Sequence, residues 1–223
     1  MTADFHWPGA ENRTTVLGAN GTGKTVLGAY ILSKQNFDRR PWVAMDFKDE
    51  VLWDMVGDPP MRDLKLGQMP KKKGLYRLRV LPGQDEDLED WLWKVWEKGN
   101  IGLFCDEASL IGRYNKAFKA ILRQGRSKLI PVIACTQRPV DVDRELFSEA
   151  NFVSVFRLDD KRDYDVVKLF TRDAPVERPL PPHWSYWYDK KQMSMWTLKP
   201  CPEPAKVAHE LSMKAPYNAF WGV

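Results

Sequence analysis

The chain has 223 residues, 43% of them hydrophobic and 29% charged, which is typical of one globular domain with a buried core. No apolar run approaches the roughly 20 residues of a membrane-spanning helix, so we expect no transmembrane segment. The net charge of +4 is too small to indicate nucleic-acid binding by itself. The three cysteines lack metal-ligand spacing, and their odd number argues against a disulfide framework, as expected in a reducing cytoplasm.

The first predicted elements surround a glycine-rich stretch at residues 18–25, which reads GANGTGKT. Four residues between two glycines, followed by Lys and Thr, form the phosphate-loop pattern. A short buried strand is predicted at 13–17 before the loop and an apolar helix at 26–32 after it, an order that directs a helix N-terminus at an anion. We therefore predict an ATP site with Lys24 on the β and γ phosphates and Thr25 on Mg²⁺. The predicted nucleotide-binding residues are Gly18, Asn20, Gly21, Thr22, Gly23, Lys24, Thr25 and Val26.

Strands and helices are predicted to alternate along the rest of the first 172 residues. Apolar runs predict strands at 42–45, 75–80, 101–105, 129–135 and 151–157, and amphipathic patterns predict helices at 85–98, 113–128 and 161–170. The strand at 75–80 alternates apolar and basic residues, so we expect it to be half-exposed. The segment 51–74 is irregular, with a short helix and a loop. This alternation predicts an α/β fold with a mostly parallel sheet between helices.

The last fifty residues differ in character from the rest. Prolines interrupt residues 175–182, residues 183–198 predict a β-hairpin, and a Pro-rich tail follows with a short helix near 207–211. We therefore divide the chain into an ATPase core at 1–172 and a C-terminal hairpin and tail at 173–223, packed on the core or extending from it.

Two acidic residues follow the apolar strand at 101–105. An Asp in this position of a phosphate-loop protein holds Mg²⁺, which assigns Asp106 to the metal. The next residue, Glu107, is placed to activate the attacking water as a general base. Gln137 ends the following strand, which in this fold class usually lies between the phosphate-loop strand and the Asp-Glu strand, and we expect it to sense the γ-phosphate.

The stretch Thr136-Gln137-Arg138-Pro139, preceded by Gln124-Gly125-Arg126, resembles the FtsK–HerA superfamily of DNA-pumping ATPases. Asp46-Phe47-Lys48 also resembles that group's Asp-Pro-Lys element, with Phe in place of Pro. Within that superfamily, the chain's small size makes it most similar to the genome-packaging ATPases of tailless, membrane-containing double-stranded DNA viruses. The resemblance covers about residues 14–170 and implies a RecA-like (ASCE-type) phosphate-loop NTPase.

The resemblance also implies how such a protein works. It implies ATP hydrolysis coupled to translocation of double-stranded DNA into a preformed capsid. It further implies self-association into a ring, with a hexamer favoured, and an arginine finger from a neighbouring subunit, for which Arg126 occupies the matching position. Arg138 and Arg157 are alternates. The implied partners are capsid or portal vertex proteins, and the implied location is the host cytoplasm, the packaging vertex of the virion, or both.

Basic residues form two candidate DNA contacts. The first combines a lysine run with a basic strand and consists of Lys71, Lys72, Lys73, Arg77 and Arg79. The second is one side of the predicted helix at 113–128, with Arg113, Lys116, Lys119, Arg123 and Arg126. Such phosphate contacts would be independent of base sequence and sensitive to salt. A solvated charged face is the alternative for the helix.

Three other functions remain open at this point. The chain could be another FtsK–HerA-type motor, such as an assembly or conjugation ATPase, although those usually add a membrane segment. It could be a slow nucleotide-dependent switch that moves nothing, or a small-molecule kinase. The Asp-Glu pair followed by Thr-Gln-Arg-Pro argues against the kinase, because a general base for water indicates hydrolysis.

Overall fold

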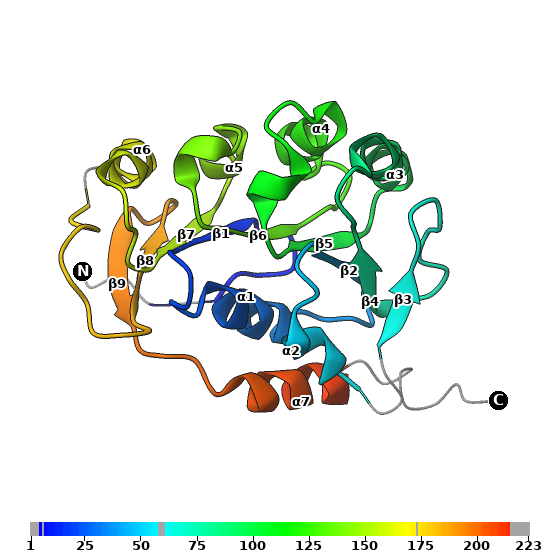
Figure 1. The fold of residues 1–223 in the computed structure, drawn as a ribbon, viewed down its shortest axis with the longest axis horizontal. Coiled ribbons are helices and arrows are strands. Elements are labelled where there is room, and N and C mark those ends of the chain that lie inside the picture. The colour runs from blue at the N-terminus through cyan, green and yellow to red at the C-terminus, as the bar shows by residue number, and fades with distance from the viewer. Residues whose placement is uncertain (1–4, 6, 58–60, 173, 215–223) are drawn as a thin grey trace.

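The computed structural model describes residues 5, 7–57, 61–172 and 174–214. Within these ranges the chain forms one nine-stranded sheet with helices on both faces (Figure 1). The strands are β1 (Thr14–Leu17), β2 (Pro41–Asp46), β3 (Arg62–Leu64), β4 (Gly74–Arg79), β5 (Gly102–Cys105), β6 (Val132–Thr136), β7 (Phe152–Val155), β8 (Ser185–Asp189) and β9 (Ser194–Leu198). Their order in the sheet is β3-β4-β2-β5-β6-β1-β7-β8-β9.

The pairing of the strands confirms the predicted α/β architecture. All neighbouring strands from β3 through β1 to β7 in the sheet pair in parallel. Strand β8 pairs antiparallel with β7, and β9 pairs antiparallel with β8. Strand β6, which ends one residue before Gln137, lies between β5 and β1, as expected. The predicted hairpin is β8–β9, and it continues the sheet beyond β7 rather than forming a separate body.

The helices divide between the two faces of the sheet. One face carries α3 (Asp85–Lys98), α4 (Lys116–Gln124), α5 (Glu145–Ser148) and α6 (Lys161–Thr171), and the other carries α1 (Lys24–Ser33), α2 (Val51–Asp54) and α7 (Pro204–Lys214) (Figure 1). Short 3₁₀ turns lie at Ala108–Ile111 and Pro139–Asp141. No helix in the described ranges is both long and apolar enough to cross a bilayer.

Local sequence accounts for the helix ends. Helix α3 has three acidic residues in its first turn and Lys98 in its last, both of which favour the helix dipole. Helix α4 is shorter than the predicted 113–128, because the Asn115 side chain caps it by accepting from the Phe118 N–H at 2.8 Å. At its other end, the Gly125 N–H closes the last turn onto the Ile121 carbonyl.

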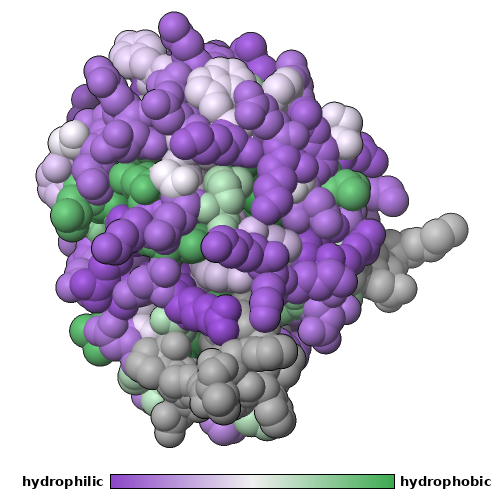
Figure 2. Space-filling model, turned by 90° about the vertical axis from the view of Figure 1, so that its right-hand side faces the viewer, coloured by the Kyte–Doolittle hydropathy of each residue, from purple (hydrophilic) through white to green (hydrophobic). Residues whose placement is uncertain are grey.

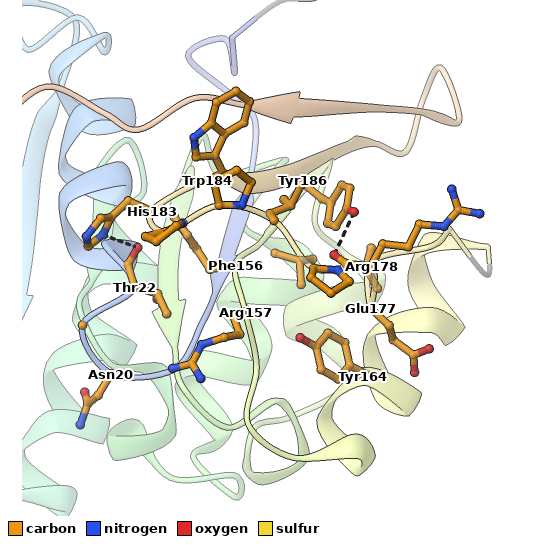
Figure 3. Close-up of a pocket in the computed structure, with 17 residues that line it drawn as sticks. Asn20, Thr22, Phe156, Arg157, Tyr164, Glu177, Arg178, His183, Trp184 and Tyr186 are labelled. Carbon is orange, nitrogen blue, oxygen red and sulfur yellow. Dashed lines mark hydrogen bonds between the residues drawn. The ribbon is translucent and has the colours of Figure 1, made fainter.

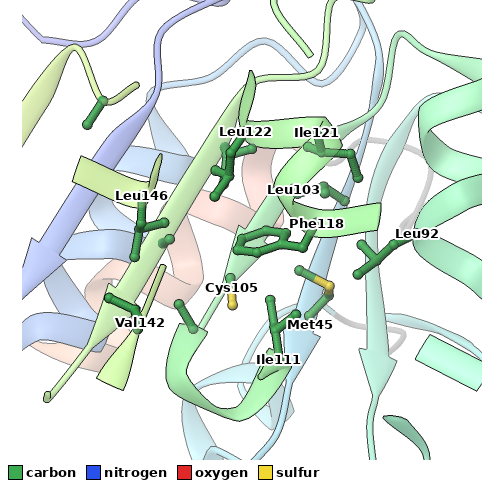
Figure 4. Close-up of a cluster of buried hydrophobic side chains, with 14 of the residues drawn as sticks. Met45, Leu92, Leu103, Cys105, Ile111, Phe118, Ile121, Leu122, Val142 and Leu146 are labelled. Carbon is green, nitrogen blue, oxygen red and sulfur yellow. The ribbon is translucent and has the colours of Figure 1, made fainter. Parts of the chain in front are cut away.

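A hydrophobic core fills each side of the sheet. On the α3–α6 side, Phe118, Ile121 and Leu122 of α4 pack against Leu103 and Cys105 of β5 (Figure 4). On the other side, apolar residues of α7 pack against α1, so the described part of the predicted tail, up to residue 214, lies over α1 and α2 on the core (Figure 1). Residues 58–60 and 215–223, which belong to the predicted loop and tail, lie outside the described residues.

Strand β4 differs from the prediction. It was expected to be half-exposed, yet five of its six residues are buried, because both faces are covered: Tyr76 and Leu78 belong to the core on the α3–α6 side and Leu75 to the core on the other side. Alternation of leucine and arginine does not reveal this burial, since Arg77 is buried together with its counter-ions. The short strand β3 was not predicted either, because three residues are too few to show a period.

Candidate functional site

The phosphate loop connects β1 to α1 and lies at the carboxyl end of the parallel strands. Lys24 and Thr25 open α1, so the helix N-terminus faces the loop's cavity. Gly23 has φ 98°, a left-handed conformation that favours glycine. Gly18 is required by space, because a Cβ there would lie 2.5 Å from Thr22 Oγ1 and 2.8 Å from Phe156 Cβ. The two glycines therefore allow the loop to adopt this tight conformation.

Asp106 follows β5 beside this loop and is fully buried. Neither of its carboxylate oxygens has a hydrogen-bond partner. Burial, followed by the charge of Glu50, raises the pKa of Asp106 to about 6. The Thr25 hydroxyl is near enough to oppose this rise, although it does not complete a hydrogen bond. A buried carboxylate without a donor and an adjacent hydroxyl form an oxygen-rich pair that fits Mg²⁺.

Glu107 is held by three groups. Its Oε2 accepts from Lys48 Nζ at 2.8 Å, and its Oε1 accepts from Ser109 Oγ at 2.8 Å and from the Gln137 backbone N–H at 3.1 Å. Burial acts to raise the pKa of this carboxyl, but Lys48, through its hydrogen bond and charge, together with the Ser109 and Thr136 hydroxyls brings the pKa below its ordinary value. Glu107 is therefore a carboxylate, as a general base must be.

Lys24 is buried and lies close to these charges. Burial and then the positive charge of Lys48 lower the pKa of Lys24, while Glu107 and Asp106 act in the opposite direction. Two ammonium groups next to each other repel, and an anion placed between them removes that repulsion. The site is thus electrostatically prepared for a polyphosphate.

A cavity of about 520 Å³ opens over the loop. Lys24, Thr25, Lys48 and Glu50 line its polar end. The remaining wall includes Phe156, His183 and the segment 200–204, which reads Pro-Cys-Pro-Glu-Pro. The C-terminal part of the chain therefore contributes to the same cavity as the phosphate loop.

A second cavity, of about 400 Å³, lies on the other side of residues 20–22 (Figure 3). Its wall includes Arg157 and Tyr164, and the Tyr186 hydroxyl donates to the Arg178 carbonyl at 3.0 Å. His183 borders both cavities, with Nδ1 3.3 Å from the Thr22 carbonyl oxygen and φ 63°. Its position in a proline-rich stretch did not predict this contact.

The structure brings Gln137 to the site and leaves Arg126 away from it. The Gln137 N–H bonds to Glu107, as described above. Arg126 lies between α4 and β6, at the amino ends of the strands, whereas the phosphate loop follows their carboxyl ends. It is exposed, and no ion pair of Arg126 is found among the described residues. Of the alternates, Arg138 contacts Asp163 at 3.4 Å and Arg157 contacts Asp159 at 3.2 Å.

The predicted basic cluster at 71–79 is not a single surface. Lys71–Lys73 are exposed and precede β4, whereas Arg79 lies at the far end of that strand, about 20 Å away at 3.3 Å per residue. Arg77 is buried and bonds Asp46 at 2.6 Å, Asp54 at 2.6 Å and Asp49 at 2.8 Å. The prediction that Arg77 is a DNA contact is therefore withdrawn, because its guanidinium already has three carboxylate partners.

The basic side of α4 is partly neutralised. Lys119 pairs with Asp143 at 2.9 Å, and Arg123 pairs with Glu145. These acidic residues belong to the segment around α5, which follows α4 and β6 in the sequence. The face predicted for α4 is thus less positive than its own sequence suggests.

Sequence reasoning missed Lys48 as a partner of Glu107. Lys48 belongs to the Asp46-Phe47-Lys48 element, which was noted for its resemblance but given no role. The available signal was its position two residues after a strand end, because polar residues at the carboxyl ends of neighbouring parallel strands meet at one edge. Strands β2 and β5 do pair directly.

Comparison with known proteins gives one clear relative. The chain is 38% identical over 171 residues to the DNA packaging ATPase P9 of Enterobacteria phage PRD1. The aligned residues cover 76% of this chain and 73% of P9. No protein-family model matches the chain.

Solved structures share the fold at low sequence identity. The genome packaging NTPase B204 of Sulfolobus turreted icosahedral virus 2, in complex with ATP-gammaS, has a TM-score of 0.70 at 17% identity, covering 86% of this chain and 98% of B204. ATPases 2 and 3 of EssC from Geobacillus thermodenitrificans have a TM-score of 0.63 at 12% identity, covering 95% of this chain and 45% of EssC. These likenesses confirm the predicted phosphate-loop NTPase fold.

Proposed function

Because the chain belongs to the family of viral DNA-packaging ATPases, we propose that it hydrolyses ATP to drive double-stranded DNA into a preformed viral capsid. The observation that carries the chemistry is the buried, unpartnered Asp106 beside a phosphate loop, followed at once by Glu107. The name and identity of the phage relative support the DNA substrate and the viral setting. The proposed location is the host cytoplasm and the packaging vertex.

We propose that ATP occupies the 520 Å³ cavity with its phosphates at the end that Lys24 and Thr25 line. The base and ribose then face Phe156, His183 and the segment 200–204. Thr25 and Asp106 would hold Mg²⁺, which neutralises charge on the β and γ phosphates.

The proposed reaction is in-line attack of water on the γ-phosphorus. Glu107 takes a proton from the water as its oxygen bonds to phosphorus, and the bond from phosphorus to the β–γ bridging oxygen breaks. The products are ADP and inorganic phosphate. The backbone N–H of Gln137 bonds Glu107 and so places this residue beside the proposed base, and we assign its side chain the role of sensing whether the γ-phosphate is present.

Assembly into a ring, with a hexamer favoured, completes the proposal. Arg126 lies at the amino ends of the strands and cannot reach the phosphate loop of its own chain at their carboxyl ends. It can therefore act as a finger only on a neighbouring subunit. An arginine finger is worth roughly 10³–10⁵ in rate.

For DNA, the exposed Lys71–Lys73 are the proposed contact, with Arg79 separate from them. They precede β4, and the face at the β3–β4 end of the sheet is largely hydrophilic (Figure 2).

The test is ATP hydrolysis by the purified full chain with and without double-stranded DNA. We expect DNA to raise the rate, and Glu107→Gln to lower it by roughly 10²–10⁴-fold while nucleotide still binds. Glu97→Gln, on the exposed side of α3, is the matched control and should behave as wild type. The proposal is wrong if DNA leaves the rate unchanged and Glu107→Gln hydrolyses ATP normally.

A further inference from the structure

The Glu107 carboxylate accepts three hydrogen bonds in this structure, which leaves about one acceptor position for a water molecule. Oε1 already accepts two hydrogen bonds, from Ser109 and Gln137, and Oε2 accepts from Lys48. An ammonium at 2.8 Å covers the oxygen that is otherwise most available to a water molecule. It also stabilises the carboxylate and so weakens it as a base. Ser109 and the Gln137 backbone are fixed near Glu107 by the chain, whereas Lys48 has a long flexible side chain.

A bound nucleotide would offer Lys48 a second anionic partner, the terminal phosphate, besides Glu107. Its side chain is 30% exposed and lines the same cavity as Lys24 and Thr25. Lys24 and Lys48 thus both face the space in which we place the phosphates, and the charge of Lys48 lowers the pKa of Lys24. Among the described residues, Glu107 is the sole carboxylate that pairs with Lys48.

We propose that Lys48 is a switching cation, which holds Glu107 when no triphosphate is bound and transfers its ion pair to the terminal phosphate when ATP binds. The transfer frees Oε2 of Glu107 to receive the proton of the attacking water. It also couples the base to its substrate, because Glu107 is released only where a γ-phosphate is present. The inference rests on the proposed function, since it needs a triphosphate in the cavity.

A simpler role for Lys48 has to be separated from this one. If Lys48 only neutralised Glu107, then Lys48→Met would leave a bare carboxylate near the γ-phosphate and weaken triphosphate binding by repulsion. The two roles differ in a Glu107→Gln background, where no carboxylate remains to repel. A switching cation still contacts the phosphate there, whereas a neutralising cation has nothing left to do.

The experiment measures Kd by calorimetry for the non-hydrolysable analogue AMPPCP and for ADP, with Mg²⁺. The proteins are wild type, Lys48→Met, Lys48→Arg, Glu107→Gln and the double variant Lys48→Met/Glu107→Gln. Lys168→Met is the matched control. It removes a lysine whose ion pair with Glu177 is 2.6 Å long and which does not line this cavity. Circular dichroism spectra establish that each variant is folded.

We expect Lys48→Met to weaken AMPPCP by about 10- to 100-fold, the range of a hydrogen bond between charged groups, and ADP by less than threefold. The same selective loss should appear in the Glu107→Gln background. Glu107→Gln alone should tighten AMPPCP, because Lys48 no longer has to leave a carboxylate, and this gain should disappear in the double variant. Lys48→Arg should retain the preference for AMPPCP.

Loss of the Lys48 effect in the Glu107→Gln background would overturn the switch and leave a neutralising role. Equal weakening of AMPPCP and ADP would also overturn it, because the contact would then not concern the γ-phosphate. If wild type itself bound neither nucleotide, the proposed function would fail instead, which is a different result from a wild type that binds with no dependence on Lys48.

Discussion

Asp106 should make the nucleotide-free protein less stable than a variant that lacks its charge. The pKa of Asp106 is about 6, against an ordinary value of 3.8, and at 1.36 kcal/mol per pH unit this corresponds to about 3 kcal/mol. Because the folded state binds this proton more tightly, the contribution of Asp106 to stability falls as pH rises from about 4 to about 6. Above that range the whole penalty is present.

The change to make is Asp106→Asn, and the measurement is urea unfolding from pH 5 to pH 8 in EDTA. Relative to the variant, wild type should lose about 1.4 kcal/mol across this window, the part of the 3 kcal/mol that lies above pH 5. Any cost of burying the amide is independent of pH and cancels in this difference. Saturating Mg²⁺ and ATP analogue should reverse the order, because wild type then gains binding energy that the variant lacks.

Glu107→Gln is the control with the opposite sign. Lys48 holds the pKa of Glu107 below its ordinary value, so this carboxylate stabilises the fold above its unfolded pKa of 4.5 and loses that effect as pH falls through its folded pKa. Glu107→Gln should therefore destabilise the nucleotide-free protein at pH 7.

The reasoning about Asp106 would be refuted if the difference in unfolding free energy between wild type and Asp106→Asn stayed constant within about 0.5 kcal/mol from pH 5 to pH 8.

Two further predictions concern DNA and assembly. Replacing Lys71–Lys73 with alanine should weaken DNA binding and reduce the salt slope of log Kd by about 2 to 3, because fewer counterions are released; an unchanged slope would move the contact to another basic face. Arg126→Ala should bind ATP but not hydrolyse it, and mixing it with Lys24→Ala should restore part of the activity. If the two variants co-assemble and the mixture stays inactive, Arg126 is not a finger acting between subunits.

Features encoded by short stretches of sequence were predictable. The glycines and Lys24 define the phosphate loop within eight residues, and the acidic first turn of α3 marks its start at Asp85. Asp106 and Gln137 follow apolar strands that must be neighbours in a parallel sheet, so their proximity followed from fold class. Each of these signals lies within a single element or its end.

Contacts between distant segments could not be predicted in the same way. Arg77 pairs with Asp46 and Asp54, 31 and 23 residues away in the chain. A basic residue in a strand indicates exposure until its counter-ions are known. The Lys48–Glu107 pair joins residues 59 apart, and its existence depends on β2 lying beside β5. Neither pairing leaves a local periodicity in the sequence.

The packing of α7 on α1 places the chain's last described helix directly after a segment that borders the cavity over the phosphate loop. Lys34 and Glu210 join the two helices at 2.8 Å, Lys214 donates to the Ser33 carbonyl at 2.6 Å, and the segment leading into α7 borders the cavity. If ATP strengthens this docking, linkage requires that docking strengthen ATP binding by the same factor. A tether or partner that pulls α7 away would then release nucleotide without touching the phosphate loop.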